Sequence, residues 1–388
     1  ARISMVALAT SVSRALALRG DLLASLHAEQ TDCYRLFHGA VEGMPGVTLD
    51  RYNELLLLNT FRDPPPSLLG ELEDVRAAVS EALPDVHLSP VYWCDRRRGA
   101  PGGGPDPSLP ASHYASELGL RYLIEAPAQG RDPWLYLDFR AARRWLRANS
   151  ADRDVLNAFS YTCGAGVAAL AGGAREVVNL DFSASALSLG TRNALLNGQM
   201  VPDKTHPPSP ASPGEGRQTS GVFSTLRADA VPALRAFAGL EPALDRRRIA
   251  GDRSNGRGPH GKRGGGRRWA SGPQRAPASS FGSAGRKFDL IVLDPPTWAT
   301  SSSGMTVDLV RDYPSLFKPA VLALRPGGSV LAANHVSAVD MERWLEILER
   351  CAAKAGRPLA SLTPLTPEAD FPSLDGKHPL KMAIATVA

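Results

Sequence analysis

The sequence predicts an α/β protein, in which a mostly parallel sheet is preceded by a small α+β domain. From residue 126 onward, short apolar runs alternate with stretches of helical periodicity, which is the pattern of parallel strands joined by crossover helices. Before residue 126, the strands follow one another with a single helix among them, which is typical of an α+β unit. The length of 388 residues also favours two domains, because single domains cluster near about 100–200 residues.

The N-terminal part of the chain begins with a helical pattern and continues with the elements of the small domain. Leu and Ala recur at helical spacing first, and Asn53-Glu54 later separates two apolar runs by the length of a hairpin turn. The expected elements are a helix at 13–29, strands at 46–52 and 55–61, a helix at 66–83, and strands at 86–94 and 118–125. We therefore expect an N-terminal helix within residues 1–30 and a small, substrate-engaging α+β domain over residues 31–125.

The second domain, residues 126–388, carries seven expected strands. They lie at 155–159, 177–180, 222–226, 288–293, 329–333, 358–362 and 381–387. The first five are followed by polar residues, and open α/β sheets bind their ligands at the carboxyl ends of the strands. The sequence therefore predicts a ligand site at this edge of the sheet.

Two segments interrupt the second domain. Residues 203–220 are rich in Pro and Ser, and residues 246–287 hold twelve basic residues against one acid among Gly, Pro and Ser. Such compositions bury too little apolar surface to offset the entropy of ordering, so both inserts are predicted to be disordered. The net charge of the whole chain is only +5, so most of its basic character lies in the second insert. That insert either attracts polyanions through their phosphates or is simply solvated, and the sequence leaves both open.

Composition excludes several classes of protein. No apolar run reaches the ~18–20 residues that a membrane span needs, so no membrane association is expected. The four cysteines, Cys33, Cys94, Cys163 and Cys351, form no CxxC pair, which excludes a zinc ribbon and disfavours a disulfide scaffold. No metal site is expected. Residues 1–20 are basic and free of acids, so an organelle remains the alternative to a cytoplasmic location.

A glycine-containing turn, Thr162-Cys163-Gly164-Ala165-Gly166, follows the first strand of the second domain. Small residues let the backbone approach a ligand, and the next helix offers free amides at its start. The turn lacks a full GxGxxG, which argues against a dinucleotide. Asp181, after the second strand, is placed to accept from ribose hydroxyls, and Asp229, after the third, from an amine such as that of adenine. Each of these acids has helix capping as its alternative role.

The sharpest motif is Asp294-Pro295-Pro296-Thr297-Trp298, directly after the fourth strand. Two prolines prevent both helix continuation and ladder donation, so the loop is expected to be extended and rigid. This geometry fixes the Asp294 carboxylate and nearby carbonyls where a reacting group can be held, and Trp298 offers a face for stacking a base. A purely structural turn is the alternative.

These motifs together resemble the class I S-adenosylmethionine-dependent methyltransferases, and more closely the bacterial large-subunit ribosomal RNA methyltransferases that modify cytosine C5 or guanine N7. The resemblance is carried by Asp32–Leu36, Glu42–Tyr52, Tyr136–Arg140, Asn157–Thr162 and Lys287–Thr297, and covers about Ser13 to Ala388 without the two inserts. It implies a Rossmann-like seven-stranded sheet, S-adenosylmethionine as cofactor and structured, ribosomal RNA as partner.

The motifs and the resemblance together give a set of expected site residues. The cofactor is expected at Phe159, Tyr161, Gly164, Gly166, Asp181 and Asp229; the transfer at Asp294, Pro295, Pro296 and Asn334; and the substrate at Arg140, Arg144, Thr297, Trp298 and His335. The arginines are expected to face substrate phosphates or the cofactor carboxylate, with a solvated basic face as the alternative. His335 either contacts the base or caps its strand.

The chain departs from the family pattern in three places. The cytosine-modifying members usually begin with a PUA module of RNA-binding type, which is not seen here. Cys163 stands where the family commonly has Gly, and we interpret it as a small replacement rather than a nucleophile. After the fifth strand the cytosine-modifying members carry a cysteine, whereas this chain has Asn334-His335. Cys351 falls at core spacing with Trp344 and Leu348.

The missing cysteine bears on the chemistry. Cytosine C5 is a poor nucleophile whose methylation ordinarily needs a thiolate adduct at C6, whereas a ring nitrogen already has a lone pair and needs only alignment and exclusion of water. We therefore expect methylation of an RNA base, with a guanine ring nitrogen favoured over cytosine C5. The alternatives are a methyltransferase of small molecules or proteins on the same fold, and a catalytically silent RNA-binding paralogue. Monomer and homodimer both remain open.

Overall fold

The structure is a computed structural model that describes residues 7–63, 67–97, 113–125, 133–201, 221–240, 285–296, 298–300, 306–308 and 312–388, without the side chains of residues 113, 298–300 and 306–308. The insert 203–220, residues 246–284 of the second insert and Thr297 lie outside the described residues. The expectation of disorder in the inserts therefore stays a prediction.

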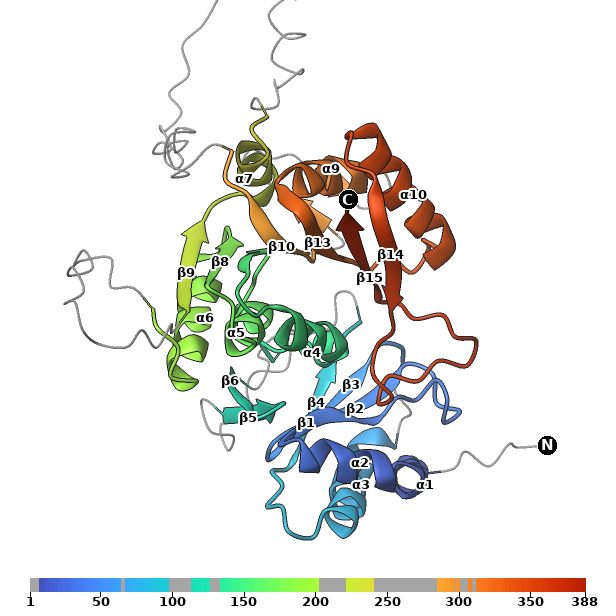
Figure 1. The fold of residues 1–388 in the computed structure, drawn as a ribbon. Helices are drawn as coiled ribbons and strands as arrows, with labels where there is room; N and C mark the ends of the chain where they lie inside the picture. The colour runs from blue at the N-terminus through green and yellow to red at the C-terminus, as the bar shows by residue number, and fades with distance from the viewer. Residues whose placement is uncertain are drawn as a thin grey trace, which may run out of the picture.

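The N-terminal part forms a four-stranded sheet in the order β1-β2-β3-β4, which we call the small sheet. Its strands are β1 (Cys33–Phe37), β2 (Val47–Tyr52), β3 (Leu55–Thr60) and β4 (Val91–Asp95). Its helices, α1 (Leu8–Leu18), α2 (Gly20–Ala28) and α3 (Leu68–Ala82), pack on one face around a core of Leu, Val and Tyr side chains (Figure 1). Asn53, at φ 53°, makes the tight turn that was expected between β2 and β3.

Three local expectations differ from the structure. The expected helix 13–29 is two helices, because the chain leaves helical geometry at Arg19, whose buried side chain binds Glu42 at 2.6 Å. Strand β1 was not predicted. The expected strand 118–125 does not join the small sheet: β6 (Leu120–Ile124) pairs with β5 (His113–Glu117) in a separate hairpin that also contacts the second half of the chain.

The large sheet confirms the expected seven strands, in the order β14-β15-β13-β10-β7-β8-β9. Its strands are β7 (Asp154–Ala158), β8 (Glu176–Asp181), β9 (Val222–Arg227), β10 (Phe288–Leu293), β13 (Leu324–Asn334), β14 (Leu359–Leu365) and β15 (Lys381–Val387). Strands β9, β8, β7, β10 and β13 are parallel, and β15 runs antiparallel to both of its neighbours. The carboxyl ends of the five parallel strands therefore share one edge.

Helices cover both faces of the large sheet (Figure 1). One face carries α4 (Arg140–Asn149), α5 (Gly164–Ala171) and α6 (Ala184–Leu196); the other carries α7 (Ala230–Phe237), α9 (Tyr313–Leu322) and α10 (Met341–Lys354). The short helix η1 (Leu137–Phe139) leads into α4, and β11 (Trp298–Thr300) pairs with β12 (Thr306–Asp308). Within the described residues, no helix is long and apolar enough to cross a membrane.

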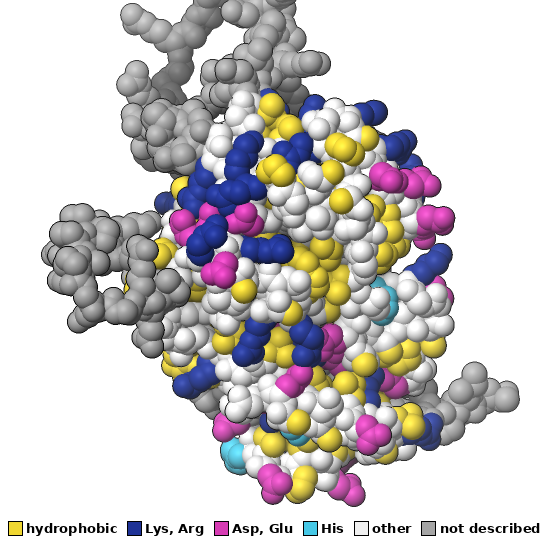
Figure 2. All heavy atoms as spheres, in the orientation of Figure 1, with side chains coloured by type: hydrophobic (Ala, Val, Ile, Leu, Met, Phe, Trp, Pro, Cys, Tyr) yellow, Lys and Arg dark blue, Asp and Glu magenta, His cyan; other side chains and the backbone are white. Residues whose placement is uncertain are grey.

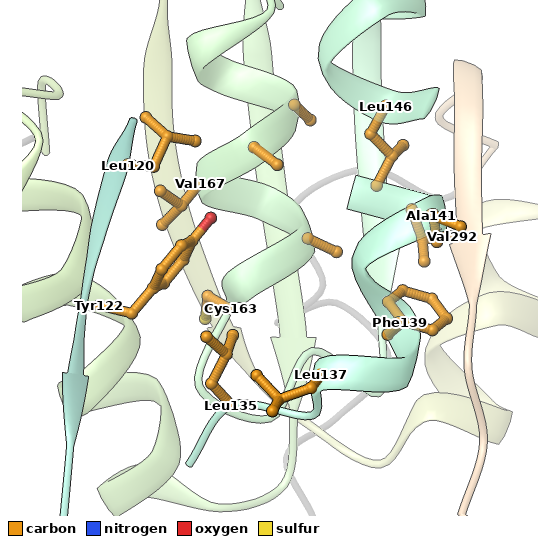
Figure 3. Close-up of a cluster of buried hydrophobic side chains, with 14 of the residues drawn as sticks. Leu120, Tyr122, Leu135, Leu137, Phe139, Ala141, Leu146, Cys163, Val167 and Val292 are labelled. Atoms are coloured by element: carbon orange, nitrogen blue, oxygen red, sulfur yellow. The ribbon is translucent and has the colours of Figure 1, made fainter. Parts of the chain in front are cut away.

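Each helical layer buries its own core. The core beneath α4 and α5 includes Leu135, Leu137, Phe139 and Cys163, whose side chains converge in Figure 3. The opposite core contains Cys351 together with Trp344 and Leu348, as the sequence predicted. The positions of the strand ends are thus fixed from both sides of the sheet.

Arg140 joins the small sheet to the large sheet. Its guanidinium is fully buried and donates to Asp370 at 3.0 Å, to Glu117 at 3.3 Å and to the carbonyl of Cys33 at 2.9 Å. Asp370 also accepts from the backbone N–H of Arg35 at 3.0 Å. These groups come from α4, the β5–β6 hairpin, β1 and the loop between β14 and β15, which runs down to the small sheet in Figure 1.

Replacing Arg140 by Met should destabilise the protein by about 3–5 kcal/mol, because buried Asp370 loses its counter-ion and Glu117 keeps only Arg143, while the apolar volume is kept. Urea denaturation measures this loss of unfolding free energy. Arg76→Met is the matched control. The ion pair of Arg76 with Glu73 is exposed on α3, so this substitution should leave the unfolding free energy unchanged. An Arg140→Met protein as stable as the control would contradict the role given to the buried network.

Candidate active site

The turn between β7 and α5 is strained. Phe159, Tyr161 and Cys163 adopt positive φ values of 59°, 47° and 61°, a region that costs non-glycine residues roughly 1–3 kcal/mol each. Hydrogen bonds hold the turn: Ser160 N–H donates to Leu180 O at 3.0 Å, and Cys163 N–H to Ser160 O at 2.7 Å. Strained backbone of this kind concentrates at ligand sites, where the surrounding structure maintains it. This turn contains the expected cofactor residues Phe159 and Tyr161.

Asp181 connects the turn to the end of β8. Its carboxylate accepts from Tyr161 N–H at 2.9 Å and from Ser183 N–H at 2.8 Å, and its side chain is nearly buried. Ser183, not Asp181, caps α6, since its hydroxyl accepts from Ala186 N–H at 3.2 Å. A carboxylate offers about four lone-pair sites, so Asp181 retains acceptor capacity for a ligand. Phe182, 67% exposed, adds an aromatic face beside it that the sequence analysis had not assigned.

Asp229 is the N-cap of α7. Its Oδ1 accepts from Val231 N–H at 3.2 Å, so the capping alternative describes its observed contact. Oδ2 has no hydrogen bond within the described residues, and a role toward an amine stays a prediction.

Gly164 and Gly166, the two glycines expected at the cofactor, differ in whether a neighbouring residue excludes a side chain at their position. A Cβ on Gly164, the first residue of α5, would make only ordinary contacts, 3.4 Å from Leu135 at the nearest. A Cβ on Gly166 would lie 2.1 Å from Asn179 Oδ1 of β8. Packing of α5 on the sheet is therefore enough to require a glycine at position 166, and the expected role of its small size in the approach of a ligand stays a prediction.

Cys163 lies beneath α6. A Cβ on Gly190 would be 2.2 Å from its Sγ, the side chain is fully buried, and burial raises the pKa of the thiol to about 12. The thiol is thus neither exposed nor ionised, which supports its interpretation as a small packing residue.

At the carboxyl ends of β10 and β13, Asp294 and His335 form a pair. His335 Nε2 lies 2.7 Å from Asp294 Oδ1. Burial of the ring opposes its charge, but the Asp294 carboxylate outweighs this effect and raises the pKa of His335 above 6.5. Asn334 is fully buried: its Oδ1 accepts from Val336 N–H at 2.8 Å, while Nδ2 has no partner in the described residues. Buried amide donors without partners are rare in native proteins.

The remaining expected site residues either are held in contacts within the chain or lie outside the described residues. Pro295 is buried and Pro296 exposed directly after Asp294, while Thr297 and the Trp298 side chain lie outside the described residues. Arg140 is buried in the network above, and Arg144 donates to Glu29 and Glu368 at 2.7 Å. The expectation that these two arginines face phosphates is thereby corrected, because their guanidinium groups are held by carboxylates of the same chain.

Two residues of the 136–140 motif to which the sequence assigned no role, Tyr136 and Asp138, lie near expected site residues. The ring of Tyr136, 52% exposed, lies 5.8 Å from that of Tyr161, which links this segment to the strained turn. Asp138 lies within electrostatic range of His335, Asp294 and Arg35. The signal was present, because both residues belong to a motif that carried the family resemblance. In the described part of the chain, no cluster of His, Cys, Asp and Glu is arranged to hold a metal ion.

Gly190→Ala should distort the strained turn, because the added methyl meets the Cys163 sulfur. We expect a loss of about 1–3 kcal/mol in unfolding free energy and weaker cofactor binding. Adding Cys163→Gly to this variant should restore most of the unfolding free energy and of the cofactor affinity. The second substitution removes the sulfur, and glycine adopts the positive φ of position 163 without strain. Chemical denaturation and calorimetry measure the effects. Gly70→Ala is the control, because the added methyl on α3 meets no neighbouring atom. Equal losses of unfolding free energy and cofactor affinity in this control would contradict the steric explanation.

The Asp294–His335 pair should give stability a defined pH dependence. Because the folded-state pKa of His335 is raised, the pair contributes fully below the ordinary pKa of 6.5 and loses this contribution as pH rises through the folded-state value. The stability gap between wild type and His335→Gln, measured by urea denaturation, should therefore shrink with rising pH. His87→Gln, an exposed control on the small sheet's side of the chain, should show a constant gap. A His335→Gln gap that grows with pH would refute the pairing.

Comparisons with known proteins agree with this geometry. Residues 34–204 match the family model described as S-adenosylmethionine-dependent methyltransferase. The ribosomal RNA large subunit methyltransferase I of Erwinia tasmaniensis is 26% identical over 370 residues, covering 92% of this chain and 72% of the relative. A ribosomal RNA large subunit methyltransferase of Deinococcus radiodurans is 28% identical over 357 residues, covering 90% and 71%.

Solved structures show the same fold. SMU.776, a proposed methyltransferase complexed with SAH, superposes with a TM-score of 0.65 at 18% identity, over 99% of this chain and 83% of that one. A proposed methyltransferase from Streptococcus mutans gives 0.62 at 18% identity, over 98% and 80%. The fold, the strained turn ending at α5 and the acid after β8 thus agree with the resemblance in the sequence. Together they support S-adenosylmethionine-dependent methyl transfer as the activity, and the chain is similar to the large-subunit ribosomal RNA methyltransferases.

Proposed function

We propose that the protein methylates a base in structured, ribosomal RNA, and that the acceptor is a guanine ring nitrogen rather than cytosine C5. The observation that carries the choice of acceptor is the sheet edge beside Asp294, where His335 and Asn334 stand at the end of β13 and every cysteine of the chain is buried. The substrate class is supported by the similarity to proteins named ribosomal RNA large subunit methyltransferases.

The residues around the turn fit S-adenosylmethionine. We assign the remaining lone pairs of Asp181 to the ribose hydroxyls and Oδ2 of Asp229 to the adenine amine. The backbone of the turn at Phe159 and Tyr161 and the free amides at Gly164 line the same place. When bound, this cofactor supplies a methyl group on a positively charged sulfur. The protein's part is to hold the acceptor atom in line with that methyl and to exclude water.

The thiols of the chain argue against cytosine C5. Burial raises the pKa of Cys33, Cys94, Cys163 and Cys351, so none is exposed as a thiolate in this structure. Without a thiolate the covalent adduct at C6 cannot form, whereas a guanine ring nitrogen attacks with its own lone pair. The pair of Asp294 and His335 then serves to position the base rather than to activate a nucleophile.

Access to the base requires that it leave its stack, which costs a few kcal/mol that protein–RNA contacts must offset. On the face shown in Figure 2, the basic side chains of the described residues gather beside acidic ones. Ion pairs such as Arg325 with Asp154 and Asp289 are examples of this neutralisation. The basic insert 246–287 is therefore our candidate for attraction of the RNA backbone.

The purified protein should transfer labelled methyl from S-adenosylmethionine to ribosomal RNA transcripts and yield methylguanosine on nucleoside mass spectrometry. Transcripts with 7-deazaguanosine, in which N7 is replaced by a C–H group, should take up no label if N7 is the acceptor. Methylcytidine as the product would overturn the choice of base. Label that survives ribonuclease treatment, or cofactor that is never consumed, would overturn RNA methylation itself.

The variant Asp294→Asn tests the role of the Asp294–His335 pair in the same methyl-transfer experiment. It should retain cofactor affinity by calorimetry while turnover falls by roughly 100-fold, because His335 loses the carboxylate that holds and charges it. Asp74→Asn, an exposed substitution on α3, should behave as wild type in both measurements.

A further inference from the structure

Asp138 is a carboxylate without a partner at the edge of the proposed transfer site. It lies on η1, is partly exposed, and makes no hydrogen bond or ion pair with any described residue. Asp294, the acid that acts on Asp138, is paired with His335, and the acids of the nearby buried network are paired as well, Asp370 with Arg140 and Glu117 with Arg143. An ionised carboxylate only accepts hydrogen bonds, so Asp138 is an acceptor whose donors are not supplied by the described residues.

The surroundings of Asp138 place it with the transfer residues rather than in bulk solvent. Burial raises the pKa of its carboxyl group, while His335 and Arg35 act in the opposite direction and favour the charged form. A partly desolvated polar group without a hydrogen bond is costly, and such groups occur where a ligand completes them. Asp138 also follows Tyr136, whose ring lies beside Tyr161 of the strained turn.

A second unmet group lies at the same strand edge and is independent of Asp138. The Nδ2 donor of Asn334 is buried and has no partner among the described residues, although Oδ1 of the same amide is satisfied. His335, the next residue, uses Nε2 toward Asp294, and its other ring nitrogen has no hydrogen-bond partner within the described part of the chain. The edge thus presents an acceptor at Asp138 and a donor at Asn334, and the protonated form of His335, which Asp294 favours, adds a second donor.

This combination matches one base edge. Guanine carries the N2 amine, the N1–H group, the O6 acceptor and N7 in sequence along its rim. Adenine and cytosine offer a ring acceptor where guanine has N1–H, and uracil has no amine. A carboxylate accepts both adjacent guanine donors at once, and a donor beside it satisfies O6, which leaves N7 toward the methyl.

Building on the proposed function, we propose that Asp138 is a specificity-determining residue that accepts hydrogen bonds from N1–H and the N2 amine of the acceptor guanine. Asn334 and His335 supply the donors for O6 on the same side. The carboxylate selects guanine because any other base would leave it desolvated and without its two donors.

The test compares transcripts that carry guanosine or inosine at the acceptor position, because inosine lacks only the N2 amine. For wild type, inosine should lower kcat/KM by roughly 10- to 100-fold, the usual effect of losing a hydrogen bond to a charged group. Asp138→Asn should lose a similar factor on guanosine and lose little more on inosine, since the interaction is already gone. A merely structural defect would not remove this dependence on the N2 amine.

Two further measurements separate the possible failures. Cofactor affinity, measured by calorimetry, should be the same for wild type, Asp138→Asn and the surface control Asp74→Asn. If Asp138→Asn loses cofactor affinity, the carboxylate serves the cofactor and the inference is overturned. If inosine costs the variant as much as it costs wild type, the carboxylate does not read the amine. Should the variant not fold, equal transfer by wild type to guanosine and inosine would by itself overturn the inference.

The proposed function can fail separately from this inference. If wild type methylates cytidine, or no RNA, both proposals fall. If wild type yields methylguanosine and the inosine comparison shows no dependence on Asp138, only the inference falls.

Discussion

The buried guanidinium of Arg140 is the constraint on which the site geometry depends. A fully buried charge is tolerated only when counter-ions and hydrogen bonds surround it, and here these come from β1, the β5–β6 hairpin and the loop before β15. Arg140 begins α4 two residues after Asp138. Holding its guanidinium therefore also holds η1 against the large sheet, so that Asp138 lies near His335. A charge that appears suited to RNA binding in the sequence serves instead to fix one half of the chain to the other.

Contacts from only a few residues hold the strained turn between β7 and α5. Three non-glycine residues with positive φ would relax if the turn were free, and Asp181 restrains the middle one by accepting from Tyr161 N–H. Gly190, which has no side chain, leaves room beneath α6 for the side chain of Cys163, and packing there holds Cys163 in its positive-φ conformation. A single carboxylate therefore shapes the turn and still has lone pairs for a ligand. This explains how a chain with Cys163 in place of the glycine of the family pattern can keep a turn of this kind.

The sequence predicted the features whose physics is local. Apolar runs predicted the seven strands of the large sheet, and the polar residues that follow the first five predicted that Asp181, Asp229, Asp294 and Asn334 lie along one edge, because both patterns are local. It could not predict what depends on distant partners. Asp370 is 230 residues from Arg140, and Asn179 of β8 is what requires Gly166 to be small. A spacing clue did exist: Arg140, Arg143, Arg144 and Arg147 recur at the period of one helix face, and the structure buries the first two and leaves the last two exposed.

The distribution of charge at the strand edge also bears on the chemistry. Asp294 is engaged by His335 at 2.7 Å, so it is poorly placed to remove a proton from a substrate. Methylation of guanine N7 needs no proton removal, but it leaves a positive charge on the ring, which makes N1–H a stronger donor. A carboxylate that accepts from N1–H then binds the transition state more tightly than the ground state, which is the condition for accelerating transfer. Asp138, which has no partner among the described residues, and the Asp294–His335 pair together are consistent with the reaction proposed above.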